Sequence, residues 1–465
     1  MQYSIVNLNE VKNASNDFLI HAEFFHLKIQ KFRKYAKNND FQKLENYVGY
    51  VKRGVQPLYS NFGTIPVLKS VNIRECGITE DRQEYVDENF FKSKKQSQVN
   101  YKDVLLTSTG VGTLGRCLIN QNNNKYFIDG HITILNNLKE LLPEFLYIYL
   151  NSKYGQEQIN VLYKGSSGQI EIYPDDIKQI LIKPLKIQQS IASLVNTSYT
   201  LRQSADILYK EAEEILLEEL GLKNYQPQNK KCFVKMLSDT QEVGRIDAEY
   251  FQPKYEDVID KIKKYNGGYA LLENFIENYS TGYPYKSEKY QNSGVPVIRI
   301  ANIEKNKLEL ENNPAFISEE YSNISKKDIA KAGNILISMS GTIGNVAEIP
   351  ENIKKCCINQ RVLSFESKNI NNKYLVLFLN SFFGYIQFER IGVGGLQINL
   401  SYNDIKNLIV PLLPQSIQSK ISAKIQQSFE SREKSKQLLE VAKRAVEIAI
   451  EENEEAGLKY IEENK

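Results

Sequence analysis

The chain contains an internal duplication that covers most of its length, and this feature limits the possible folds more than any other. Five short blocks occur twice in the same order, at offsets between 226 and 230 residues. The matching blocks are Ile20–Phe25 with Ile246–Phe251, Ile65–Ile73 with Val295–Ile303, Gly112–Gly115 with Gly341–Gly344, Asp176–Lys178 with Asp404–Lys406, and Pro184 and Gln188 with Pro411 and Gln415. A repeat of this length is a whole domain and not a solenoid unit, so two similar globules in tandem are predicted.

Each half has the same predicted order of secondary structure. A short amphipathic helix, Tyr255 to Tyr265 in the second half, precedes short β-rich segments that are separated by Gly, Asn and Ser turns. Examples of these segments are Ile65–Val71, Val104–Ser108 and Ile335–Ser338. One long helix then follows. The fold class predicted is α+β: two tandem globules of mixed, β-rich structure with short helices, each followed by a long helix.

The two long helices carry the alternating three- and four-residue spacing of a coiled-coil seam. In residues 187–220 the seam is Ile191, Leu194, Ser198, Leu201, Ala205, Leu208, Ala212 and Ile215. After Pro414 it is Ile421, Ile425, Ser428, Arg432, Ser435, Leu439, Ala442, Val446 and Ala449. Because such a seam needs a partner, we predict that the two helices pair as an antiparallel coiled coil. Two independent surface helices, or dimerisation helices, are the alternatives.

These features divide the chain into four predicted segments. The first globule takes residues 1–186 and its long helix residues 187–226, which end in a polar stretch around Pro227. The second globule takes residues 227–413 and the distal long helix residues 414–465. Gly221, just past the last apolar seam position, is a natural helix stop.

Composition favours an ordinary globular protein. Hydrophobic residues make up 42% and charged residues 25% of the chain, and the net charge is +3. No apolar run approaches the length of a membrane span, and the N-terminus lacks the order of a secretory signal, so we expect a cytoplasmic protein. The five cysteines contain no C-x-x-C pair, which favours free buried thiols over a zinc site or disulfides.

Sequence motifs of the common enzymes are missing from the chain. It has no P-loop, no dinucleotide fingerprint, no N-P-P-[YF], H-E-x-x-H or G-x-S-x-G motif, and only three histidines. We therefore expect no catalytic residue, no metal site and no cofactor in this chain. Carboxylates are numerous enough that a nuclease site remains an alternative.

The repeated blocks resemble the specificity subunit of Type I restriction–modification systems over nearly the whole chain. Ser340–Gly344 and Thr113–Gly115 resemble the glycine turn of that family, and Cys357–Arg361 its Asn-Gln strand, with Phe127–His131 as the weaker counterpart. The runs Asp404–Gln415 and Asp176–Gln189 resemble those that lead each globule into its helix. Lys186–Gln189 departs from the pattern, since the family often has a Pro and an acidic residue there.

This resemblance implies a function. Each globule would be a target-recognition domain that reads one half of an interrupted, asymmetric double-stranded DNA site. The helices would set the gap and bind two adenine methyltransferase (modification) subunits, and restriction (translocase–nuclease) subunits would join that complex. S-adenosylmethionine, ATP and Mg²⁺ would then belong to the partner subunits and not to this chain.

Base reading requires polar side chains on exposed loops, where Arg or Lys suits guanine and Asn or Gln suits adenine. In the first half we predict DNA contacts by Lys52, Arg53, Gln56, Lys69, Ser70, Asn72, Ser108, Thr109, His131, Lys164, Ser166, Ser167 and Gln169. In the second half we predict contacts by Tyr283, Tyr285, Lys286, Arg299, Asn302, Ser338, Ser340, Gln360, Arg361, Gln397 and Asn399.

Each of these assignments has a structural alternative. Exposed Lys and Ser are ordinarily solvated, Asn72 and Asn302 suit turn caps, and His131 suits a structural hydrogen bond. The glycines of the two repeated turns are better explained by positive φ than by DNA contact. For the chain as a whole, the alternatives are a coiled-coil scaffold that binds protein, and the DNA-recognition part of a fused methyltransferase–nuclease.

Overall fold

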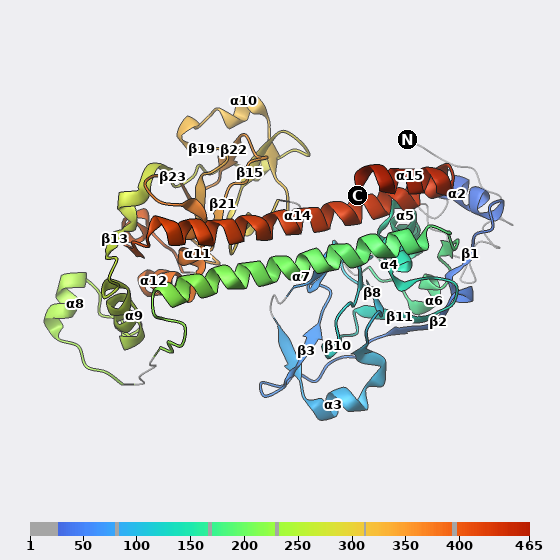
Figure 1. Cartoon of the computed structure of the whole chain (residues 1–465), viewed down its shortest axis with the longest axis horizontal. Helices are drawn as coiled ribbons and strands as arrows, with labels where there is room; N and C mark the ends of the chain where they lie inside the picture. The colour runs from blue at the N-terminus through green and yellow to red at the C-terminus, as the bar shows by residue number, and fades with distance from the viewer. Residues whose placement is uncertain (1–26, 80–82, 166–169, 228–231, 311–312, 393–397) are drawn as a thin grey trace. The chain divides into compact units, whose positions relative to one another are not determined.

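The computed structural model describes residues 27–79, 83–165, 170–227, 232–310, 313–392 and 398–465. It separates into two compact units, Met1–Ser204 with Ser431–Lys465, and Ala205–Glu430. Figure 1 shows the elements of both along the chain. We call the described parts of residues 1–186 and 227–413 head 1 and head 2.

Head 1 contains two four-stranded sheets. The first has the order β2-β11-β8-β9, with antiparallel neighbours throughout. Its strands are β2 (Val48–Arg53), β11 (Ile132–Leu138), β8 (Val104–Thr107) and β9 (Cys117–Ile119). The second has the order β6-β3-β10-β7, and its central strands β3 and β10 are parallel. Its strands are β6 (Glu84–Val86), β3 (Ile65–Leu68), β10 (Tyr126–Ile128) and β7 (Gln98–Val99).

Short helices and two-stranded ladders complete head 1. The ladders are β1 (Gln42–Lys43) with β12 (Leu181–Ile182), and β4 (Ile73–Arg74) with β5 (Gly77–Ile78). The helices are α2 (Leu27–Lys37), η2 (Leu44–Asn46), α3 (Glu88–Ser93), η3 (Lys95–Ser97), α4 (Pro143–Asn151), α5 (Lys153–Leu162) and α6 (Pro174–Ile177).

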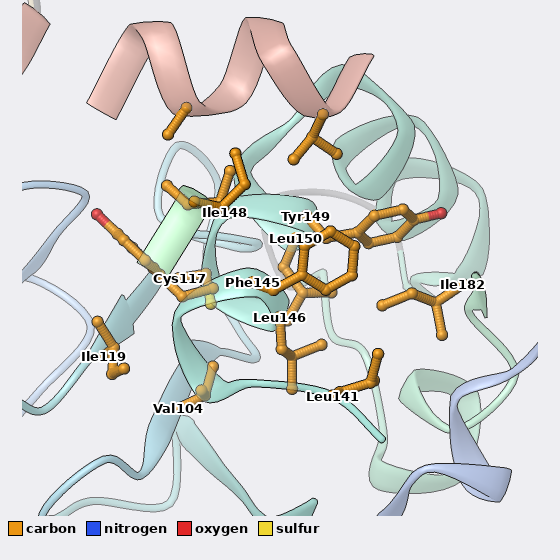
Figure 2. Close-up of a cluster of buried hydrophobic side chains, with 14 of the residues drawn as sticks. Val104, Cys117, Ile119, Leu141, Phe145, Leu146, Ile148, Tyr149, Leu150 and Ile182 are labelled. Carbon is orange, nitrogen blue, oxygen red and sulfur yellow. The ribbon is translucent and has the colours of Figure 1, made fainter. Parts of the chain in front are cut away.

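The core of the first unit lies between α4, the first sheet and the long helices. Phe145, Leu146 and Tyr149 on α4 are fully buried and pack with Val104 and Cys117 of the sheet, as Figure 2 shows. The same cluster includes seam residues from the last part of the chain: Leu439, Ala442, Val446 and Ala449. The distal helix therefore completes the core of the head that is most distant from it in sequence.

Head 2 repeats the two four-stranded sheets of head 1. The sheet β14-β23-β20-β21 corresponds to the first sheet of head 1, and β18-β15-β22-β19 to the second, again with a parallel central pair, β15 and β22. The bounds are β14 (Ile276–Ser280), β23 (Val362–Ser367), β20 (Ile335–Ser338), β21 (Val346–Glu348), β18 (Phe316–Ile317), β15 (Val295–Ile298), β22 (Cys356–Ile358) and β19 (Ile329–Ala330).

Both two-stranded ladders of head 2 and most of its short helices have counterparts among the described elements of head 1. The ladders are β13 (Tyr269–Leu271) with β24 (Ile409–Pro411), and β16 (Ile303–Glu304) with β17 (Lys307–Leu308). The helices are α8 (Leu237–Val243), α9 (Pro253–Lys263), η4 (Leu272–Phe275), η5 (Ser287–Lys289), η6 (Ile300–Asn302), α10 (Glu319–Ser322), η7 (Lys326–Asp328), α11 (Asn372–Asn380), α12 (Phe382–Ile391) and α13 (Tyr402–Ile405). Ala212 and Leu216 of the first long helix, and Ile421 and Ile425 of the second, belong to the core of this unit.

The long helices are α7 (Gln188–Glu219) and α14 (Gln415–Glu451). Within the first unit, Ser198 Oγ lies 2.8 Å from Ser435 Oγ. Within the second, Ser428 Oγ donates to the Ala205 carbonyl over 2.7 Å. Contact positions therefore rise along α7 as they fall along α14, so the helices pair antiparallel. Small residues at these positions let the two backbones approach each other.

The distal segment, expected as one long helix, is divided into two. After α14 ends, the Asn453 side chain accepts from Ala456 N–H and begins α15 (Glu454–Asn464). A Cβ on Gly457 would lie 2.9 Å from the Ala445 carbonyl oxygen, so α15 packs closely against α14, as Figure 1 shows. Asn453 favours a new helix start at this point, because its side chain accepts a hydrogen bond from a backbone N–H in the first turn of α15 that has no partner within the helix.

The structure confirms the predicted fold class, the duplication and the antiparallel helix pair. The predicted assignment of four chain segments to recognition and spacing stays a prediction, since each compact unit combines one head with parts of both helices. Of the helices in the described part of the chain, none combines the length and apolar character needed to cross a membrane.

Candidate nucleic-acid interface

In head 1, loops meet where several strands end. Because β3 and β10 are parallel, their carboxyl ends lie side by side, and the residues that follow are Lys69 and Asp129. Arg53 ends β2 and pairs with Thr133 near the start of β11. An isolated bridge between Thr109 and Glu171 adds a loop from later in the chain. We call edge 1 the set Arg53, Lys69, Thr109, Asp129, His131, Lys164, Glu171 and Tyr173.

Hydrogen bonds and ion pairs hold edge 1 together. The Thr109 hydroxyl and His131 Nδ1 share a hydrogen bond of 2.7 Å, and the His131 backbone N–H donates to Asp129 Oδ1 over 2.9 Å. Arg53 Nη1 lies 3.4 Å from Glu171 Oε2, and its guanidinium carbon lies 5.6 Å from the centre of the Tyr173 ring. The exposed groups of His131 and Tyr173 are therefore oriented by fixed neighbours.

The two acids of edge 1 have opposite electrostatic environments. The Tyr173 hydroxyl, followed by Arg53, holds the pKa of Glu171 below its usual range. Burial raises the pKa of Asp129, although His131, Lys69 and Arg53 oppose that rise. Edge 1 therefore combines cations with two carboxylates whose pKa values are shifted in opposite directions.

Head 2 builds a corresponding edge from different side chains. Arg361 is exposed, and its Nη1 donates to Asn399 Oδ1 over 2.8 Å. Asn359 Nδ2 donates to the Tyr290 hydroxyl over 3.2 Å, and the guanidinium of Arg299 lies 5.6 Å from the centre of that ring. We call edge 2 the set Arg299, Ser340, Asn359, Gln360, Arg361 and Asn399.

Matching backbone hydrogen bonds relate the two edges position by position. Ser108 N–H donates to the His131 carbonyl, as Met339 N–H does to that of Arg361. Likewise Asp129 N–H donates to Leu68, as Asn359 N–H does to Ile298. The bridge of Thr109 with Glu171 corresponds to that of Ser340 with Asn399. At these equivalent positions head 1 carries Asp129, His131 and Glu171. Head 2 carries Asn359, Arg361 and Asn399 there.

Some predicted contact residues are held in internal turns. Asn72 is buried, its Oδ1 accepts from Lys69 N–H over 3.0 Å, and its Nδ2 donates to the Thr79 carbonyl over 2.9 Å. Asn302 makes the equivalent bonds with Arg299 and Glu309. These contacts match the turn-capping alternative.

Two predicted serines are also buried. The Ser108 hydroxyl shares a 2.6 Å hydrogen bond with Thr133, and the Ser338 hydroxyl donates to the Thr342 carbonyl over 2.5 Å. Ser340 is likewise 1% exposed. The hydroxyls of Ser108 and Ser338 therefore form hydrogen bonds within their own heads, next to the edges.

The other predicted residues lie around the edges. Lys52, Gln56 and Lys286 are exposed, and Ser70 and Tyr283 are half-buried. Tyr285 is buried, with its ring centre 5.0 Å from that of Tyr283. Ser166, Ser167, Gln169 and Gln397 lie outside the described residues. The turn glycines Gly112, Gly115, Gly341 and Gly344 all have positive φ, as the structural alternative predicts.

Asp129, Asn359, Glu171 and Tyr173 were not among the predicted contact residues, although they belong to the edges or contact them. Asp129 and Asn359 lie inside repeated blocks that had been singled out. Glu171 could have been found by applying the repeat offset to Asn399, which had been predicted. Tyr173 gives no comparable signal, because its equivalent in the second half is Ser401.

Metal-binding chemistry is not apparent in the described part of the chain, where no three His, Cys, Asp or Glu side chains gather as metal ligands. All five cysteines are free thiols, as expected, but only Cys117, Cys356 and Cys357 are buried. Cys76 and Cys232 are exposed, which corrects the expectation of uniformly buried thiols.

Sequence comparison matches part of the chain to a known family. Residues 272–444 match the family described as "Type I restriction modification DNA specificity domain". The chain is 27% identical over 177 residues to the Type I restriction enzyme EcoAI specificity subunit of Escherichia coli, covering 36% of this chain and 29% of that protein. It is 32% identical over 126 residues to a Haemophilus influenzae chain named as a type I restriction enzyme specificity subunit, covering 26% and 30%. The chain thus matches under a third of the length of these relatives.

Two solved structures give low similarity scores over most of the chain. The S subunit of a Type I system from M. genitalium has a TM-score of 0.42 at 15% identity, covering 90% of this chain and 95% of that one. The HsdS subunit from Thermoanaerobacter tengcongensis has a TM-score of 0.29 at 12% identity, covering 89% and 96%. The likeness rests on the sequence matches: residues 272–444, less than half of the chain, are similar to the DNA specificity domain of Type I restriction–modification systems.

Proposed function

We propose that this chain reads an interrupted, asymmetric double-stranded DNA site and directs partner subunits to it. The observation that carries the proposal is the pair of edges, built on the same backbone framework but with different side chains. Equivalent loops would meet DNA in the same way, while the exchange of His131 for Arg361 and Glu171 for Asn399 changes the groups offered to base edges. Two different half-sites follow.

The side chains of edge 2 suit base reading in the major groove. The Arg361 guanidinium has five N–H donors, and the bond to Asn399 orients it while using one of them. An oriented guanidinium can donate two hydrogen bonds to O6 and N7 of guanine. Arg361 is therefore proposed to read guanine, with Gln360 beside it. At edge 1, His131 and Arg53 are the donors, and Lys69 and Lys164 are placed to contact phosphates.

The antiparallel helices α7 and α14 are proposed to set the gap between half-sites and to bind two modification (methyltransferase) subunits. Restriction subunits would join this complex. The chain is proposed to be non-catalytic and cytoplasmic, with S-adenosylmethionine, ATP and Mg²⁺ bound by its partners. This division is consistent with a chain whose sequence lacks the common nucleotide-binding motifs.

The proposal is tested by expressing the chain with and without its modification subunit and sequencing the methylated adenines in the host DNA. Expected is one bipartite motif with two unlike halves, present only in the co-expressing cells. Methylation by the chain alone would favour the fused-enzyme alternative. Absence of any bipartite motif, together with no gel shift on random bipartite DNA, would favour the protein-binding scaffold.

A further inference from the structure

The hairpin of β4 and β5 in head 1 lies against both long helices of its unit. Its turn residue Glu75 has Oε1 2.6 Å from Lys443 Nζ on α14. The Glu75 carbonyl accepts from the hydroxyl of Tyr147, a buried residue of α4, over 2.7 Å. The turn is therefore fixed by one contact to the helix pair and one to the core of the head.

Gly77, the first residue of β5, contacts α7. Its φ is +144°, a conformation that side chains rarely adopt, and a Cβ there would lie 2.2 Å from Arg202 Nη1. The guanidinium of Arg202 thus occupies the space where a side chain would be. Arg202 on α7 and Lys443 on α14 together enclose the hairpin.

Charge distinguishes this contact from ordinary packing. Cys76, between Glu75 and Gly77, has an exposed side, but its thiol is partly shielded from water, which raises its pKa, as does Glu75, while Arg202, Lys436 and Lys443 oppose the rise. The helices therefore present Arg202, Lys436 and Lys443 to the turn, and Lys443 is shared between Glu75 of the turn and Glu440 of α14. Only 15% of the Lys443 side chain is exposed, so its ion pair is better shielded from solvent than a surface pair.

Head 2 has the equivalent hairpin, β16 and β17, whose turn carries a lysine at the position of Glu75. Its turn carries Lys305, which lies 4.8 Å from the centre of the Tyr385 ring on α12. On α7, burial raises the pKa of Glu213, and the nearby cations Lys210 and Lys305 oppose that rise. The next turn residue, Asn306, accepts from Asn380 Nδ2 over 2.9 Å. In this head the hairpin turn carries a cation, Lys305, where head 1 has Glu75, and its charge acts on Glu213 of α7.

We propose that the two hairpins, anchored by the Glu75–Lys443 ion pair and the Arg202 contact in head 1 and by the contacts of Lys305 and Asn306 in head 2, hold each head in one orientation on the helix pair and thereby determine which gap lengths the protein accepts. The inference rests on the proposed function, since the gap matters only if both heads read DNA. It assigns Glu75, Lys443, Arg202, Lys305 and Glu213 as positioning residues for spacing that do not read bases.

The test uses the full chain in complex with its modification subunit and DNA in which the half-sites are constant and the gap varies by single base pairs. Glu75→Lys and Lys443→Glu are each expected to reduce, at least threefold, the ratio of methylation rate at the preferred gap to that at its neighbours. The double variant E75K/K443E restores the pair with reversed polarity and should return to within twofold of wild type. Lys125→Glu, which breaks the 2.9 Å pair with Glu88 in the same head but away from the helices, is the control and should keep the wild-type profile.

Two further measurements accompany each variant: thermal unfolding, which shows whether it folds, and the base sequence of the half-sites that it methylates. Should the charge-reversed singles fail to fold, Glu75→Gln and Lys443→Met remove the charge with less disturbance and carry the same expectation. Folded variants with an unchanged gap profile would overturn the inference, as would variants with altered half-site bases. A wild-type complex that methylates no bipartite DNA would instead overturn the proposed function. The two failures are thus distinguishable.

Discussion

Arg361 Nη1 donates a hydrogen bond to Asn399 Oδ1 over 2.8 Å, which joins the turn after β22 to the loop that precedes α13. Arg361 also has a φ of +72°, although it is not glycine. Such a conformation costs on the order of 1–3 kcal/mol and persists only where the surroundings enforce it. The backbone at Arg361 is thus strained and its side chain oriented, which suits a residue placed for recognition.

Replacing Arg361 with Ala should weaken discrimination at one base pair of the half-site read by head 2. The expected loss is about 1–3 kcal/mol, the value of a bidentate contact with guanine. Competition binding with DNA carrying each of the four base pairs at every half-site position measures it. Equal weakening on all sequences would show that Arg361 contacts phosphate. Lys305→Ala, which lies outside edge 2, should leave the base preference unchanged.

Exchanging residues 244–411 for the matching segment of a relative should change one half-site and leave the other intact. The physical reason is that each edge is formed within a single head, by contacts such as Thr109 with His131 and Arg361 with Asn399. Sequencing of methylated adenines from cells that express the exchange variant gives the motif. A change in both halves would mean that the heads do not read independently.

Asp129→Asn should make head 1 more stable at neutral pH. Burial raises the pKa of Asp129 in the folded protein. The wild-type protein is therefore most stable, relative to the variant, at a pH below the ordinary pKa of Asp, ~3.9. That advantage is lost as the pH rises through the raised folded pKa. The amide cannot ionise, and head 2 already has Asn359 at the equivalent position.

Urea unfolding at a series of pH values from 4 to 7 measures this difference, and the stability gain of Asp129→Asn should grow with pH. Asp175→Asn serves as the control, because Asp175 is exposed and its pKa is lowered by Lys178. That variant should gain nothing as the pH rises. A constant difference for Asp129→Asn across the series would contradict the prediction.

Repetition made most of the fold predictable from sequence. The seam positions, the strands around Val104 and Ile335 and the turn glycines follow from local pattern, and a second copy of each supported the first. The N-cap at Asn453 was missed because the apolar spacing of α14 gives no sign of where a capping side chain interrupts it.

The edges were only partly predictable, because they combine loops distant in sequence. Exposure of a polar residue cannot be read from its type: Ser108 and Asn72 were predicted as contacts but are buried in hydrogen bonds. Glu171 reaches the edge through a bridge to Thr109, a pairing across 62 residues that no local pattern reveals. The choice among polar residues therefore depends on tertiary hydrogen bonding.

Ser198→Leu should destabilise the helix pair by about 1–3 kcal/mol. Ser198 is 3% exposed and its hydroxyl donates to the Ser435 carbonyl over 2.9 Å, so a larger side chain forces the helices apart and removes that bond. Thr200→Leu, at an exposed position of the same helix, is the matched control and should change stability by less than about 0.5 kcal/mol. Denaturant unfolding decides the outcome, and equal effects of the two substitutions would contradict close packing at Ser198.

Lengthening the helix pair by one heptad should lengthen the preferred gap between half-sites. Seven residues inserted after Ala205 keep the seam in phase and add about 10 Å at 1.5 Å per residue. Because Ser428 bonds to the Ala205 carbonyl, α14 needs a matching heptad between Gln427 and Ser428 to keep the pairs on either side of the insertion.

At about 3.4 Å per base pair, this added length corresponds to roughly three base pairs of gap. The same change turns one half-site about the DNA axis by about 100°, given 10–10.5 base pairs per turn. The paired insertion should therefore methylate DNA with a longer gap or lose activity, while a single insertion in α7 alone should lose activity because its seam no longer matches α14. Methylation across gap-length variants measures both. A paired-insertion protein that methylates the original gap at the wild-type rate would show that α7 and α14 do not determine the spacing.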